Sequence, residues 1–183
     1  MNTQFTSTAL TGAGLAIGLA LLIVEHWRWW KTGGGAAAAG GGGRDPKALA
    51  PYWSGVGFGT LMVACPAGLL GAAAGVLRWG GNSLGDALMS TLTGQRSSTV
   101  ATASAPRLDG NGALVVTALV IVLWLMRKQI AKLAKRGFKS GVWSGTLLAI
   151  GTGTFALIGN LVVPNVNSLG GMLLGKVVHG TFL

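Results

Sequence analysis

The sequence holds few of the residues that enzymes use for chemistry. Its 183 residues include four acidic side chains, two histidines and one cysteine. A single cysteine excludes an intramolecular disulfide bond, and so few acids and histidines leave almost no material for a metal site or an acid–base pair. Charged residues make up only 10% of the chain, whereas half of it is hydrophobic. This balance excludes an ordinary soluble enzyme and predicts an integral membrane protein without catalytic, cofactor or metal sites.

Four apolar stretches are long enough to cross about 30 Å of hydrocarbon as helices. They are residues 5–24, 52–77, 112–126 and 142–163. The sequence therefore predicts an all-α bundle of four transmembrane helices. Residues 1–24 carry no charge, unlike the basic start of a secretory signal peptide, so we expect the first stretch to be kept as an anchor. Residues 164–183 contain too short an apolar run to span and are expected to form an interfacial or re-entrant tail.

Aromatic and basic residues mark where the predicted spans meet the membrane surfaces. The cluster 25–31 closes the first span, and the second span leaves the membrane at Arg78 and Trp79. The connections after the first and third spans hold ten Lys and Arg residues, against four on the other side. Because cytoplasmic loops carry the excess of positive charge, we expect both termini to lie outside. The Gly- and Ala-rich composition favours a bacterium with a GC-rich genome, and hence the bacterial cytoplasmic membrane.

Two connections are expected to lie outside the bundle. Residues 32–51 begin with a Gly/Ala run and predict a flexible cytoplasmic linker. A phosphate-binding loop is the alternative for this run, but the Gly-Lys-Ser/Thr ending that it requires is missing. Residues 78–111 predict an outer loop that contains a short amphipathic helix at 83–92, lying either on the membrane surface or against the bundle.

The connection after the third span is strongly basic. On a helical wheel its cations occupy one half of a helix that would extend the third span into the cytoplasm as far as Gly137. These cations are Arg127, Lys128, Lys132, Lys135, Arg136 and Lys139. Such a face is suited to phosphate groups of nucleic acid or anionic lipid, or to an acidic partner. The plainer alternative is that the six charges only orient the chain in the membrane.

Small residues recur at four-residue spacing, a pattern that allows helix backbones to approach closely in lipid. The candidate packing residues are Gly14, Gly18, Gly68, Gly71, Gly75, Gly141 and Gly145. We expect them to pack the first, second and fourth spans and to mediate homo-oligomerisation, with the third span peripheral. Gly55, Gly57 and Gly59, together with Pro66, make the second span the candidate for a kinked or pore-facing helix; the alternative is that they only permit close packing.

Asp, Glu, Lys, Arg and His are missing from all four predicted spans, which argues against an ion-coupled transporter or a membrane-embedded enzyme. The sequence favours a non-catalytic, oligomeric membrane subunit, a scaffold or pore component of a macromolecular transfer or secretion apparatus. In span count, basic cytoplasmic loops and Gly/Ala richness, the chain is similar to small multi-span membrane proteins of actinobacterial plasmid transfer and to inner-membrane subunits of secretion systems. The alternative is a phage-type holin or a small channel-forming protein.

Overall fold

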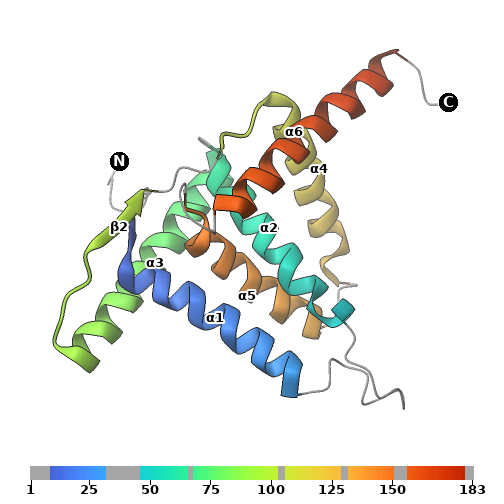
Figure 1. The fold of residues 1–183 in the computed structure, drawn as a ribbon. Helices are drawn as coiled ribbons and strands as arrows, with labels where there is room; N and C mark the ends of the chain where they lie inside the picture. Colours follow the sequence, from blue (N-terminus) through green and yellow to red (C-terminus); the bar gives the residue numbers. More distant parts are fainter. Residues whose placement is uncertain are drawn as a thin grey trace.

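The computed structural model describes residues 9–31, 46–65, 68–102, 106–128, 132–150 and 156–179, which are mostly helical (Figure 1). The helices are α1 (Gly12–Lys31), α2 (Ala50–Ala64), α3 (Gly68–Thr93), α4 (Gly110–Leu125), α5 (Lys132–Leu148) and α6 (Ala156–His179). Two 3-10 turns, η3 (Pro46–Leu49) and η4 (Met126–Lys128), and two short antiparallel strands, β1 (Ala9–Thr11) and β2 (Thr99–Thr102), complete the described elements. The predicted all-α class is confirmed.

The most extensive contact between two elements is that of α2 with α5. Glycines four residues apart form the contact on both helices, Gly55 and Gly59 on α2 and Gly141 and Gly145 on α5. A methyl group on Gly59 would overlap the carbonyl of Val142, and one on Gly145 would overlap the backbone of Val56. The two backbones therefore touch directly, without side chains between them.

The remaining helices pack around this pair. α1 contacts α5 and α3, and α4 contacts α6. A small apolar core of Leu61, Ala64, Leu108, Val116 and Val163 forms where α2, α4 and α6 meet. The C-terminal half of α6 projects beyond the bundle (Figure 1).

A polar cluster holds the start of α1. The Thr11 hydroxyl accepts a hydrogen bond from the Gly14 amide at 3.0 Å, and the Ser97 hydroxyl accepts one from Ala13 at 2.8 Å. The Asn82 side chain on α3 accepts from the Thr11 amide and donates to the Ala9 carbonyl. These hydrogen bonds supply acceptors for backbone amides that have none within the first turn of α1. They also join β1, α1 and α3 at one end of the bundle.

The second predicted span is not one helix, and residues 78–93 are not a loop. α2 ends at Ala64, α3 begins at Gly68, and the two helices are bent by 109° relative to each other. Cys65 takes an extended conformation, with φ −71° and ψ 116°, as the residue before a proline is driven to do. Pro66 itself lies outside the described residues. α3 continues through Arg78 to Thr93 and so includes the amphipathic stretch 83–92 expected within the outer loop.

The third and fourth predicted spans also need correction. α4 ends at Leu125, and the basic residues from Lys132 onward begin a separate helix, α5, which packs on α2 and α1. Gly137 lies inside α5 and does not end a helix. The stretch 142–163 is divided between α5 and α6, and the expected tail forms the second half of α6, with Pro164 inside that helix.

One described helix, α6, is long and apolar enough to cross a membrane, over Ala156–Val178. The bent pair of α2, with its preceding turn, and α3 meets the same criterion if it counts as one broken span, and α4 is a shorter apolar helix. The four-span bundle expected from the sequence is therefore unconfirmed. The expected C-terminal tail is not a separate element, because residues 164–178 belong to the continuous helix α6.

The glycine contact leads to a matched pair of substitutions on α2. Gly59→Ala should lower the free energy of unfolding by about 1–3 kcal/mol, because the new methyl group overlaps the backbone of α5. Gly57→Ala should leave it unchanged or raise it by up to about 1 kcal/mol, since nothing described lies within 4 Å of the added carbon and alanine favours helix. Thermal unfolding followed by circular dichroism in mild detergent measures both. Equal effects of the two substitutions would contradict the direct backbone contact.

Candidate polyanion interface

Exposed cations gather at one end of the bundle, called here the basic end. The last turn of α1, the start of α2, the end of α4 and the start of α5 all lie there (Figure 1). Its exposed cations are Arg28, Lys31, Lys47, Lys128, Lys135, Arg136 and Lys139. Within the described ranges the acid nearest to these positions in sequence is Glu25, which pairs with Arg28 at 3.3 Å. The basic end thus combines four chain segments into one positive surface.

α5 supplies the densest part of this surface. Lys135, Arg136 and Lys139 lie in its first two turns, on one side of the helix, and the first turn holds no acid. The exposed amides of a helix N-terminus add positive potential of their own. The glycine contact with α2 fixes the position of the helix, and Phe138 packs on Phe58 with ring centroids 5.8 Å apart. The three side chains are therefore presented from a rigid support.

Two of the six cations singled out in the sequence are placed only by their backbone. Arg127 lies in the turn after α4, and Lys132 is the first residue of α5. Their side chains lie outside what the structure describes, as do residues 129–131. The structure brings Lys128, Lys135, Arg136 and Lys139 to the same end of the molecule, but on two elements instead of one continuous helix.

The candidate packing glycines contact other helices of the same chain. Gly14 faces Asn82 of α3, and Gly18 faces Leu147 and Leu148 of α5. These two glycines therefore do not offer the free face that oligomerisation through them requires. Association of copies of this chain remains a prediction without an assigned surface.

The glycines at the start of α3 differ from one another. Gly68 adopts a left-handed conformation, with φ +84°, where the chain turns after α2. A side chain on Gly71 would press against the Cys65 carbonyl at 2.8 Å, and Gly75 is buried. These positions serve the sharp turn and the packing within the chain.

Sequence reasoning missed the most unusual polar residue of the fold. Arg78, expected at a membrane surface, is buried in α3 with 1% of its surface exposed. Its guanidinium group donates hydrogen bonds to the carbonyls of Thr146 at 2.8 Å and Ala149 at 2.6 Å. Both acceptors lie at the C-terminal end of α5, where helical carbonyls lack partners within the helix and favour a positive charge. The acceptors lie about seventy residues away in sequence, so no local signal reveals this role.

Comparisons with known proteins add no functional assignment. No protein family matches this chain, and the searches of curated proteins and of solved structures find none that is similar to it. Within the described ranges no group of three or more His, Cys, Asp or Glu residues is placed to hold a metal ion.

The buried guanidinium group gives a second testable prediction. Arg78→Leu should lower the free energy of unfolding by about 3–5 kcal/mol, because two buried carbonyls lose a charged donor. Arg78→Lys should cost less, since an ammonium group can still reach one carbonyl. Arg107→Leu is the control at an exposed position, where about 0.5 kcal/mol or less is expected. Denaturant unfolding in detergent measures both free energies of unfolding. The same value for Arg78→Leu and Arg107→Leu would show that Arg78 does not hold α5 in place.

Proposed function

We propose that this protein is a non-catalytic membrane subunit whose basic end faces the cytoplasm and binds a phosphate-rich polyanion, nucleic acid being the partner expected in a macromolecular transfer apparatus. The observation that carries the proposal is the gathering of seven exposed cations from four chain segments at one end of the bundle. Phosphate contacts by Lys and Arg supply most of the affinity of proteins that bind nucleic acid without sequence preference.

The apolar surface of the chain supports a membrane environment. Large hydrophobic side chains are exposed along α1, α3, α4 and α6, including Leu69 and Leu92 on α3, at 86% and 80% exposed, and Leu161 on α6, at 66%. Soluble monomers rarely expose so many large apolar side chains. Contact with lipid accounts for these side chains without a further partner.

Aromatic residues support the orientation. Trp27, Trp30 and Trp53 are largely exposed at the basic end, and the Lys31 ammonium lies 5.3 Å from the Trp27 ring centre. Tryptophan beside lysine and arginine is typical of a membrane–water interface, and cytoplasmic surfaces carry the positive excess. In this orientation β1 and the projecting half of α6 lie toward the outer side (Figure 1).

Cysteine labelling tests the orientation. In a Cys65→Ala background, Ser98→Cys should react with a membrane-impermeant maleimide on intact cells, whereas Ala48→Cys should react only after permeabilisation. Both positions are exposed, so a difference reports the side of the membrane and not burial. Labelling of Ala48→Cys in intact cells, with protection of Ser98→Cys, would reverse the proposed topology.

Duplex DNA tests the polyanion interface. We expect the purified protein to bind it with an affinity that falls steeply with salt, because each neutralised phosphate adds about 0.9 to the slope of the log–log plot. The triple variant Lys135→Gln, Arg136→Gln and Lys139→Gln should lower this slope by up to about three. Fluorescence anisotropy of labelled DNA at several salt concentrations gives the slope.

A second triple variant controls for net charge. Arg96→Gln, Arg107→Gln and Lys176→Gln removes the same number of exposed cations away from the basic end and should leave the slope unchanged. Equal slopes for the two triple variants, or no DNA binding at low salt, would contradict the proposed binding. The cations of the basic end would then serve only to orient the chain in the membrane.

A further inference from the structure

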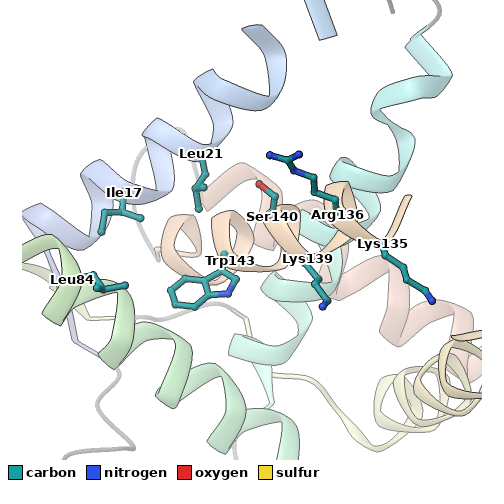
Figure 2. A pocket seen from close by; sticks show the side chains of 8 residues that line it. All are labelled: Ile17, Leu21, Leu84, Lys135, Arg136, Lys139, Ser140 and Trp143. Atoms are coloured by element: carbon teal, nitrogen blue, oxygen red, sulfur yellow. The ribbon is translucent and has the colours of Figure 1, made fainter. Parts of the chain in front are cut away.

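A groove with two chemically different ends lies between α1, α3 and α5 (Figure 2). Its volume is about 650 Å³, within the range of pockets that hold small-molecule ligands. Lys135, Arg136 and Lys139 line it toward the start of α5. The groove therefore begins at the densest part of the basic end and extends along α5 into the bundle.

The rest of the groove is apolar. Ile17 and Leu21 of α1, Leu84 of α3 and Trp143 of α5 form its walls (Figure 2). Leu84 is 56% exposed, so its side chain offers apolar surface to a ligand in the groove. Lys135 and Trp143 are eight residues apart on α5, which separates the charged from the apolar part by about 12 Å. A ligand that fills the groove must therefore carry an anionic group and an apolar chain about a dozen ångströms long.

Ser140 lies between these two parts, four residues after Arg136 and three before Trp143. Its hydroxyl is buried and has no hydrogen-bond partner within the described residues. A buried hydroxyl without a partner costs free energy, which a nearby acceptor such as a phosphate oxygen would recover after a small side-chain rotation. The Ser140 hydroxyl is thus a hydrogen-bond donor beside the cations, and no described residue accepts a hydrogen bond from it.

We propose that this groove binds one anionic glycerophospholipid, with its phosphate on Lys135, Arg136 and Lys139 and an acyl chain along the apolar walls. Basic pockets between membrane helices on the cytoplasmic side are suited to such headgroups. Nucleic acid has no apolar chain for Leu84 and Trp143, and a free phosphate would leave these side chains uncovered. The inference rests on the membrane placement of the proposed function but not on its binding of nucleic acid.

Lipid retention in detergent tests the headgroup. The full-length protein, purified in mild detergent, is mixed with dioleoyl phosphatidylglycerol or dioleoyl phosphatidylcholine, and bound lipid is counted by native mass spectrometry. We expect one phosphatidylglycerol to be retained at least tenfold more tightly than phosphatidylcholine, which has the same acyl chains. The triple variant of Lys135, Arg136 and Lys139 should abolish this preference, because each cation near a headgroup contributes about fivefold at low salt. Equal retention of the two lipids by the parent protein would overturn the proposal.

Two leucines on α3 test the groove itself. Leu84→Trp should fill the apolar part and lower retention of phosphatidylglycerol at least fivefold while all cations remain. Leu88→Trp, one helical turn further and equally exposed, does not line the groove and should have no effect. Equal retention by the two variants would assign the lipid to the general apolar surface and overturn the proposal. Helical content and elution volume identify any variant that fails to fold, in which case Leu84→Phe replaces it.

A third measurement locates the acyl chain. Phosphatidylglycerol with brominated chains should quench the fluorescence of the parent protein more than that of Trp143→Phe, because Trp143 lines the groove. Identical fractional quenching of the two would place the chain elsewhere. Loss of DNA binding with groove-dependent lipid retention intact would contradict the nucleic-acid part of the proposed function and leave the lipid site standing.

Discussion

The direct backbone contact between α2 and α5 determines where most other parts of this fold lie. Gly55 and Gly59 meet Gly141 and Gly145 at a spacing that leaves no room for side chains. In a membrane, where lipid chains are as apolar as leucine, close van der Waals contact replaces the hydrophobic effect as the force between helices. Once α5 is fixed on α2, its remaining surface contacts α1 and α3, and the open groove forms between the three helices.

The cations near the N-terminal end of α5 oppose its helix dipole, whereas the cation bound at its C-terminal end is favoured by the dipole. Lys135, Arg136 and Lys139 lie near the positive N-terminal end, an arrangement that destabilises an isolated helix. Arg78 donates to carbonyls at the C-terminal end, where a cation is favourable. The contacts of α5 with Arg78 and with the glycines of α2 hold the helix in place despite these cations. A bound phosphate would offset the repulsion between the cations and the positive end of the helix dipole.

Residue patterns predicted the all-α class, but not the helix boundaries. A hydropathy pattern averages over Cys65 and Pro66 and so hides the local steric effect that ends α2 and turns the chain. The fourth predicted span ends at residue 163, before Pro164, although a proline is tolerated inside an apolar membrane helix where other groups satisfy the freed backbone carbonyl. Arg78 and the groove depend on residues far apart in the sequence, which no local pattern connects.

The three helices that line the groove are the ones that Arg78 and the glycine contacts hold together. Gly18 brings α1 onto α5, and Arg78 joins α3 to the end of the same helix. A lipid that touches Leu21, Leu84 and Trp143 at once would bind this assembled arrangement and not the separated helices. By linkage, its binding would then stabilise the fold in proportion to the logarithm of its concentration. The proposed lipid would thus relieve the conflict of charges at the start of α5, and the full stability of the bundle would depend on anionic lipid.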